Sequence, residues 1–403
     1  MSRSPKALAL LVFAVLLAGC LGGDSPSGSP RIPGSTLTIY SSLPAHGLSA
    51  VAARAVAAGE RLALDDAGGR AAGRRVRLVR LDSTRPGERV WEPALVSANA
   101  KQAVDDATAV AYLGELNYGA SAVSVPITND HDVLQVSPGD GLASLTTVPP
   151  GRPQAGPARY YPKERRSFLR LTASDLRQAE ALLARARRSG ARRLAVVFDG
   201  QIYGRELASE LLALARRDGP EPVAGEELRG DPTGMPGFVQ DIAGERPDAV
   251  VYAGVAGPLT GPLMAALARG LPRVPVFATA GLLAHAAPLP VAPSTVEAVS
   301  TQRPAARLSG HARRLLRRVA RRAGLASAGT EALYGYESMR LVLDAIDAAG
   351  PTRRGVIRAA LTPRSRRSPV GRYDIHASGD VTPDRLALYR LRDGLFAFER
   401  ELP

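Results

Sequence analysis

The sequence predicts an α/β fold with two lobes, each built on a parallel sheet. Short apolar runs alternate with alanine-rich helical segments through most of the 403 residues. Such alternation indicates parallel strands that are covered by helices on both faces. About 370 residues follow the first 35, which is enough for two domains of ordinary size. A polar, proline-rich stretch at residues 152–166 separates the first set of strands from the second.

The first 20 residues have the pattern of a secretory signal. Arg3 and Lys6 precede an apolar run from Ala7 to Leu17, which is too short to span a bilayer. The run ends in Leu-Ala-Gly-Cys, the form of a bacterial lipobox, in which the cysteine is lipidated and becomes the new N-terminus. That residue, Cys20, is the single cysteine of the chain. We therefore expect a protein on the extracytoplasmic face of the membrane, periplasmic or at the cell surface, held by a lipid on Cys20 and a flexible tether at 21–35.

Composition and motifs exclude several classes of function. The net charge of +14 becomes about +12 when Arg3 and Lys6 leave with the signal (14 − 2), and the excess is nearly all arginine. Nucleic-acid binding needs basic residues interleaved with stacking aromatics, and aromatics make up only 5% of the chain. The five histidines lack metal-ligand spacing, so we expect neither metal nor cofactor. A GxSxG elbow and a phosphate-binding GKS or GKT are missing, which argues against hydrolases.

The first lobe is expected to contain four strands with helices between them. The predicted strands are 36–40, 75–81, 109–113 and 133–136, and the predicted helices are 48–66, 93–105 and one that begins near Ala120 and Ser121. The first of these helices is rich in alanine and the third in small residues. The first third of the chain is therefore predicted to form a parallel sheet.

Two glycine-rich loops follow neighbouring strands of this sheet. The strand 109–113 leads into Gly114-Glu115-Leu116-Asn117-Tyr118-Gly119, and the strand 133–136 leads into Ser137-Pro138-Gly139-Asp140-Gly141. The carboxyl ends of parallel strands are where open α/β sheets bind ligands. Free N–H groups at the helix N-terminus, with nearby hydroxyls, suit a carboxylate or similar anion. The alternative is that both loops are ordinary strand-to-helix turns.

The second lobe repeats the alternation. Strands are predicted at 167–171, 194–198, 222–226, 249–252 and 274–278, and helices at 174–188, 205–217, 236–243 and 263–269. Helices at 311–323 and 331–349 and strands at 373–381 and 386–399 complete the chain. Arginine pairs at 313–314, 317–318 and 321–322 recur every four residues along one helical face. That face is either solvated or in contact with anionic lipid headgroups or a transporter.

Several motifs, in their order and spacing, resemble one family. They include IYSSLP at the first strand, GELNYGAS followed by VSPGDGLASLT, AVVFDGQIYGRELA, and EALYGYESMRLVLDAIDAAG. The chain is similar to extracellular solute-binding proteins of the leucine/isoleucine/valine-binding type, which have the periplasmic-binding-protein type I fold. The resemblance implies lobe I at 36–170 plus 302–368 and lobe II at 171–301 plus 369–403. Three crossings, near 170–173, 300–304 and 369–374, would form a hinge with a ligand cleft between the lobes.

The resemblance also implies a set of ligand-binding residues. In lobe I these are Ser41, Ser42, Asn117, Tyr118, Gly119, Ala120, Ser121, Ser137, Gly139, Asp140 and Gly141; in lobe II they are Tyr203, Gly254 and Gly281. Tyr118 and Gly141 replace hydroxyl residues of the family, and the family's ammonium-binding acid would fall near Gly281. Since a buried ammonium without a partner is costly, Asp140 either supplies the missing carboxylate or caps its own loop.

The expected function is capture of a small organic ligand without catalysis. The resemblance implies a monomeric, lipid-anchored protein that delivers an amino acid, or a related carboxylate or amide, to the permease subunits of an ABC transporter. We expect an anionic or carbonyl group of the ligand at the N–H groups of Gly119 to Ser121, with Tyr203 closing over an apolar or aromatic body. A ligand sensor of the same fold without transport is the alternative, and an exported enzyme comes third.

Overall fold

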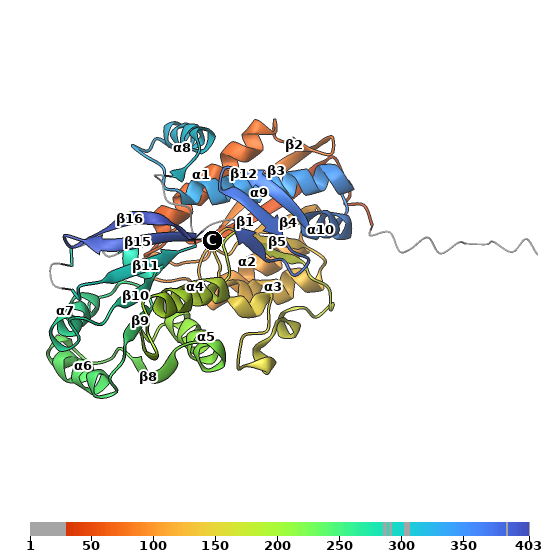
Figure 1. Cartoon of the computed structure of the whole chain (residues 1–403). Coiled ribbons are helices and arrows are strands. Elements are labelled where there is room, and N and C mark those ends of the chain that lie inside the picture. The colour runs from red at the N-terminus through yellow and green to blue at the C-terminus, as the bar shows by residue number, and fades with distance from the viewer. Residues whose placement is uncertain (1–29, 285–287, 290–291, 302–306, 384–385, 403) are drawn as a thin grey trace, which may run out of the picture.

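The structure is a computed structural model, shown in Figure 1, and it describes residues 30–284, 288–289, 292–301, 307–383 and 386–402. The predicted signal, the lipidation site Cys20 and most of the tether lie outside the described residues. Within the described part of the chain, no helix is long and apolar enough to cross a membrane.

The first sheet has five parallel strands and a short antiparallel edge. Its order is β2-β3-β1-β4-β5-β6. The strands are β1 (Thr36–Leu43), β2 (Arg70–Ala71), β3 (Arg74–Asp82), β4 (Ala109–Leu113), β5 (Leu134–Ser137) and β6 (Phe168–Arg170). Because alternate residues of a strand point to opposite faces, β1 contributes Ile39 to one hydrophobic cluster and Tyr40 to another. The sheet is therefore buried on both sides, as its parallel pairing requires.

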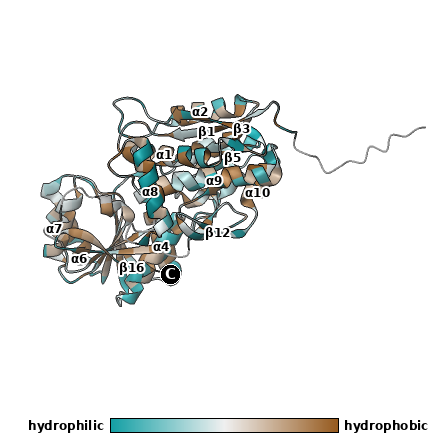
Figure 2. Cartoon of the chain, turned by 90° about the horizontal axis from the view of Figure 1, so that it is seen from above, coloured by the Kyte–Doolittle hydropathy of each residue, from teal (hydrophilic) through white to brown (hydrophobic). Residues whose placement is uncertain are grey.

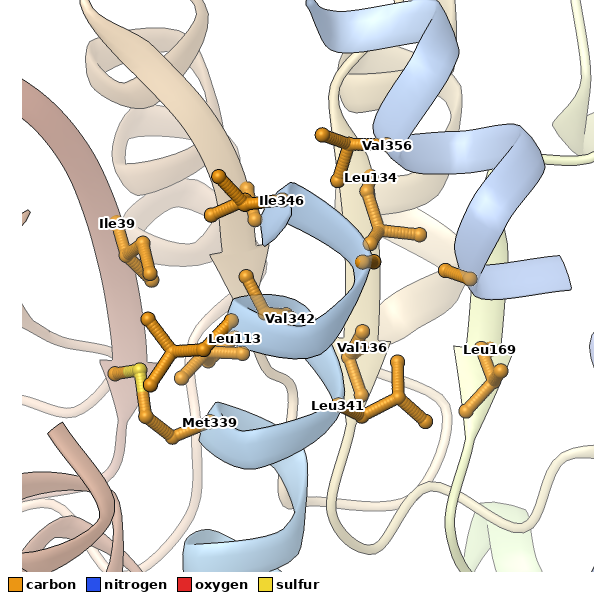
Figure 3. Packing of buried hydrophobic residues seen from close by; sticks show 14 of the residues in the cluster. Ile39, Leu113, Leu134, Val136, Leu169, Met339, Leu341, Val342, Ile346 and Val356 are labelled. Atoms are coloured by element: carbon orange, nitrogen blue, oxygen red, sulfur yellow. The ribbon is translucent and has the colours of Figure 1, made fainter. Parts of the chain in front are cut away.

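Helices from two distant parts of the sequence cover this sheet. They are α1 (Ala50–Asp66), α2 (Pro93–Asp105), α3 (Ser121–Asp130), α9 (Glu331–Ala349) and α10 (Arg353–Leu361), and α8 (Gly310–Ala323) packs on α1 and α9. Figure 3 shows α9 packing Met339, Val342 and Ile346 against Ile39 and Leu113 of the sheet. Helix α9 also packs on α1 at a glycine: a side chain at Gly335 would overlap the carbonyl oxygen of Val56.

The second sheet also has five parallel strands, extended by a hairpin. Its order is β16-β15-β11-β10-β9-β7-β8. The strands are β7 (Arg193–Phe198), β8 (Glu221–Glu227), β9 (Ala249–Ala253), β10 (Val276–Thr279), β11 (Val296–Ser300), β15 (Leu386–Arg392) and β16 (Leu395–Leu402). One face carries α4 (Asp175–Arg188) and α5 (Ile202–Asp218), and the other carries α6 (Met235–Gly244) and α7 (Thr260–Gly270). Figure 2 shows hydrophobic (brown) strands of this sheet beside α6 and α7, and the largely hydrophilic (teal) helix α8 beside α1.

Both segments predicted as strands near the C-terminus are hairpins. Residues 386–399 form β15 and β16, which turn at Asp393 and Gly394, both with positive φ (50° and 79°). Residues 373–381 divide between β13 (Gly371–Ile375) and β14 (Val381–Pro383), and β13 pairs with both β14 and β12 (Arg364–Ser368). Tyr373 and Val381 belong to the core of the first sheet. The part of the tail at 371–383, which was expected in lobe II, therefore packs with lobe I.

The chain crosses between the two sheets after β6, after β11 and after β14. We call the first sheet with its covering helices and β12–β14 lobe I, and the second sheet with its helices lobe II. The first two crossings are linked by the hydroxyls of Thr172 and Thr301, which are 3.3 Å apart. The third crossing lies beyond Pro383, later than the predicted 369–374, because β12–β14 remain with lobe I.

Candidate ligand-binding site

The two glycine-rich loops lie side by side at the carboxyl edge of the first sheet. Strands β4 and β5 are parallel neighbours, with Leu113 opposite Val136. The N–H of Gly114 donates to the carbonyl of Val136 at 2.9 Å. Gly139 packs so closely on Leu116 that a Cβ there would lie 2.8 Å from the Leu116 carbonyl oxygen. Both glycine-rich loops therefore lie at the carboxyl edge of the first sheet, as the sequence predicted.

Asp140 occupies the position at the start of α3 that was expected to receive a ligand anion. Its carboxylate accepts hydrogen bonds from the N–H groups of Gly119 (3.0 Å), Ser121 (2.9 Å) and Leu142 (3.1 Å). Burial raises the pKa of Asp140, and these N–H donors oppose the rise. The carboxylate thus acts as a cap between the loops. Two N–H groups that we expected to face the ligand are already engaged in this arrangement, and Ala120 N–H donates to a backbone carbonyl.

Ser41 and Ser42 lie inside β1, which extends to Leu43, beyond the end of the strand predicted at 36–40. Their hydroxyls donate to the buried acids Glu60 (2.7 Å) and Glu115 (2.9 Å). Burial raises the pKa of Glu115 to about 8, opposed by the hydrogen bonds from Tyr112 and Ser42. The two serines therefore satisfy carboxyl groups of the lobe I interior, because β1 continues to Leu43.

Three further predicted binding residues also make contacts within lobe I. The Ser137 hydroxyl donates to the carbonyl of Glu115 at 2.7 Å, and the Ser121 hydroxyl accepts from the N–H of Glu115 at 3.3 Å. The Asn117 amide donates to the Ser49 hydroxyl at 2.8 Å. These bonds give the loop after β4 a defined shape.

The two lobes meet where Tyr118 contacts Tyr203. The ring centroids are 5.1 Å apart and the planes are inclined by 71°. Tyr203 lies in the first turn of α5, which begins earlier than the helix predicted at 205–217, and its hydroxyl donates to the Gln178 side chain at 2.6 Å. Nearby, the N–H of Asp175 donates to the Gly141 carbonyl at 3.0 Å. A Cβ at position 141 would lie 2.6 Å from the Asp175 carboxylate, so the close approach requires glycine.

The other two glycines predicted for lobe II pack against each other. Gly254 follows β9 and Gly281 follows β10, and the N–H of Ala256 donates to the Gly281 carbonyl at 3.0 Å. A side chain at Gly281 would overlap the Gly254 carbonyl oxygen, and one at Gly254 would meet Asp199. The contacts described for both residues are with lobe II, so they shape the strand ends on that side.

Sequence reasoning missed the charged residues beside the tyrosine pair. Asp175 and Glu210 are 6% and 1% exposed. Burial raises the pKa of Asp175 to about 7 and that of Glu210 to about 8. Glu206 is paired with Arg152 at 2.5 Å. We call Tyr118, Arg152, Asp175, Tyr203, Glu206 and Glu210 the interlobe site. The spacing of Tyr203, Glu206 and Glu210 along one helical face was a usable signal; Asp175 looked like an ordinary first-turn acid.

Arginines elsewhere in lobe I belong to other surfaces. All six paired arginines of α8 are exposed, but Arg318 and Arg322 form ion pairs with Asp66 and Asp65 of α1. A separate cavity of about 670 Å³ is lined by Arg165, Arg166, Arg354 and Arg358, with no residue of the interlobe site. Among the described residues, no cluster of three or more His, Cys, Asp or Glu side chains is arranged to hold a metal ion.

Comparisons with known proteins agree with this architecture. Residues 37–394 match the family model described as periplasmic binding protein. A leucine-binding protein from Thermotoga maritima is 20% identical to this chain, with a TM-score of 0.68. The match covers 91% of this chain and 98% of the Thermotoga maritima chain. A Streptococcus pneumoniae branched-chain amino acid transporter protein in complex with isoleucine is 19% identical with a TM-score of 0.68, covering 91% and 100%.

A third structural relative carries a different ligand. A Rhodopseudomonas palustris solute-binding protein in complex with p-hydroxybenzoic acid is 16% identical with a TM-score of 0.69, covering 91% of this chain and 96% of its own. A search of curated protein sequences gives no match. The family model spans most of the chain, and the fold of these solute-binding proteins is the one observed. The chain therefore belongs to the periplasmic binding protein family, whose members are solute-binding proteins and not enzymes.

Proposed function

We propose that this chain is a lipid-anchored, extracytoplasmic solute-binding protein that captures a small organic ligand between its lobes and delivers it to an ABC transporter. The observation that carries the proposal is the meeting of Tyr118 from lobe I and Tyr203 from lobe II at the carboxyl ends of the two sheets. A ligand that contacts both lobes stabilises their closed arrangement, which is how hinged binding proteins respond to a solute.

The residues of the interlobe site favour an amino acid or a related carboxylate or amide. The tyrosine rings offer an apolar or aromatic surface to the ligand body. The Asp175 Oδ2 atom is buried and has no hydrogen-bond partner among the described residues, so it suits an ammonium group. Arg152 Nε is likewise buried and unpaired within the described chain, so it suits a carboxylate. The relatives in complex with isoleucine and p-hydroxybenzoic acid bind an amino acid and an aromatic carboxylate.

A thermal-shift screen followed by small-angle scattering tests ligand capture. The screen covers amino acids, amides, short peptides and aromatic acids. A ligand that raises the melting temperature should also reduce the radius of gyration, because it holds the lobes together. Leucine, isoleucine and valine are expected to bind weakly, because Tyr118 fills space over the first loop. A tight ligand that causes no compaction would contradict the interlobe location of the site.

The lipid anchor has its own test. Cys20→Ser should block lipidation, so the variant should either keep its uncleaved signal or be released into the medium. Detergent partitioning and mass measurement of the N-terminus distinguish these forms. Partitioning of the variant that equals the wild type would contradict the anchor. Delivery to a transporter predicts that deleting the gene abolishes uptake of the ligand, whereas a sensor would leave uptake intact.

A further inference from the structure

Two carboxyl groups of the interlobe site form no ion pair, although the charges of Arg152 and Arg170 lie near enough to lower their pKa values against the effect of burial. Asp140 is held by backbone N–H groups, and Glu206 is paired with Arg152. The neighbouring Arg170 is fully buried and forms an ion pair with Asp380 at 2.8 Å. In the described parts of the chain, Asp175 and Glu210 form no ion pair. Buried carboxylates in proteins are normally paired or hydrogen-bonded, so these two groups need an explanation.

Glu210 is the more isolated of the two. Both of its carboxyl oxygens are shielded from solvent and have no hydrogen-bond partner among residues 30–402 that the structure describes. It shares a face of α5 with Tyr203 and Glu206, at spacings of seven and four residues. The lobe I segment around Arg152 covers that face: Arg152 reaches Glu206, and a Cβ at Gly151 would lie 3.2 Å from the Ala213 side chain. Glu210 is therefore enclosed between the lobes.

The Tyr118 hydroxyl adds an independent unpaired group at the same place. Its oxygen is buried and makes no hydrogen bond of good geometry in the described chain, while its hydroxyl favours the ionised form of the adjacent Asp175. After burial, the charges of Asp175 and Glu210 are the main causes that raise the pKa of Tyr118. A hydroxyl and two carboxyls can together accept the hydrogens of one or two ammonium groups. They lack the arrangement of three or more acid or histidine ligands that a metal ion would need.

We infer that Glu210 receives a positively charged organic group of the ligand, an ammonium or guanidinium, so that the ligand is a basic amino acid or a diamine. This inference rests on the proposed function and specifies the ligand of the same site. Asp175 supplies the carboxylate for the second positive charge, nearer to Gly141 and Tyr118. The apolar chain between the two charges lies against the tyrosine rings.

The protonation of Glu210 gives a second, independent readout. Burial and the charge of Asp175 raise the pKa of Glu210 to about 8, and Arg152 opposes the rise. Without a cation, the Glu210 carboxyl is therefore protonated at neutral pH. A cation that binds to it favours the ionised form. Ligand binding at pH 7 should then release a proton to the buffer.

Calorimetry with paired probes tests the inference on the full chain. L-lysine is compared with norleucine, which lacks the terminal ammonium, and 1,5-diaminopentane with 1-aminopentane. We expect the dication of each pair to bind at least tenfold more tightly, and Glu210→Gln to remove that ratio. Titrations in two buffers of different ionisation enthalpy should show more proton release in the wild type than in Glu210→Gln, where only Asp175 can still ionise on binding. Glu60→Gln is the matched control, because Glu60 is another buried glutamate with an unpaired oxygen, located inside lobe I.

The outcomes separate this inference from the proposed function. Equal binding of lysine and norleucine, or a lysine preference that survives Glu210→Gln, would overturn the inference. If norleucine or benzoate still compacts the protein, the proposed function stands. If nothing in the screen compacts it, both fail. Proton release needs no variant, so lysine binding without proton release contradicts the inference even if Glu210→Gln does not fold.

Discussion

The ring of Tyr118 stands edge-on against the ring of Tyr203, with their centroids 5.1 Å apart. The two residues follow strands of different sheets, one in each lobe, so their contact depends on how the lobes are placed. It also brings Tyr118 beside the carboxyl groups of Asp175 and Glu210. The tyrosine pair is therefore both a lobe-to-lobe contact and one wall of the interlobe site.

Truncating either tyrosine should weaken ligand binding. Tyr118→Ala and Tyr203→Ala should each reduce affinity by about 1–3 kcal/mol, as removal of buried aromatic anchors does. Calorimetry with the best ligand from the screen measures the loss. The control is Tyr389→Ala, which breaks a similar edge-on pair with Phe398 (5.9 Å) in lobe II. That variant should lose stability and keep its affinity; equal losses of affinity in all three would contradict the assignment.

Replacing the Asp140 carboxylate should destabilise lobe I. The amide of Asp140→Asn has one acceptor oxygen where the carboxylate now serves three N–H groups, so we expect a loss of about 1–3 kcal/mol in the free energy of unfolding. Urea unfolding measures it. Asp231→Asn, an exposed acid that caps η4 (Pro232–Gly234), should cost much less. If Asp140→Asn keeps its stability and loses affinity only for cationic ligands, the residue is an ammonium partner instead.

Glu115 should make the protein less stable as the pH rises. Its pKa in the folded protein is about 8, above the ordinary 4.5. Below pH 4.5 both states are protonated; above it the unfolded chain ionises first, so folding loses free energy until the pH reaches about 8. Glu115→Gln should reduce this loss by on the order of 3 kcal/mol. Unfolding midpoints at pH 5 and pH 8 measure it, and an unchanged pH dependence would show that Glu115 is already ionised.

A side chain added at the close contact between α1 and α9 should lower the stability of the folded protein. In Gly335→Ala the new methyl group would overlap the backbone oxygen of Val56, which cannot move without separating the helices. We expect a loss of about 1–3 kcal/mol by urea unfolding. Gly237→Ala in α6 is the control: a Cβ there has nothing within 4 Å, so the change should be neutral or stabilising by up to about 1 kcal/mol. Similar effects at both positions would contradict the close packing at Gly335.

Local pattern alone was enough for many elements of the fold. The helix Pro93–Asp105, the strand Ala109–Leu113 and the helix Glu331–Ala349 have the bounds that periodicity and flanking residues predicted. The hairpin at Asp393-Gly394 was also recoverable, because Asp-Gly between apolar strands is a strong turn signal with positive φ at both residues. These features depend on residues that are close together in the chain, so the local sequence pattern is enough to predict them.

The use of each polar group at the site was decided by tertiary structure. The sequence placed Asp140 in the right loop, but its partners are the N–H groups of another loop. The predicted strand ended at residue 40, whereas β1 continues to Leu43. Ser42 is therefore buried, and its hydroxyl donates to Glu115. Asp175 and Glu210 come together with Tyr118 only because the lobes meet. Hydrogen-bond partners and burial arise from contacts between residues distant in the chain, and local periodicity carries no information about those contacts.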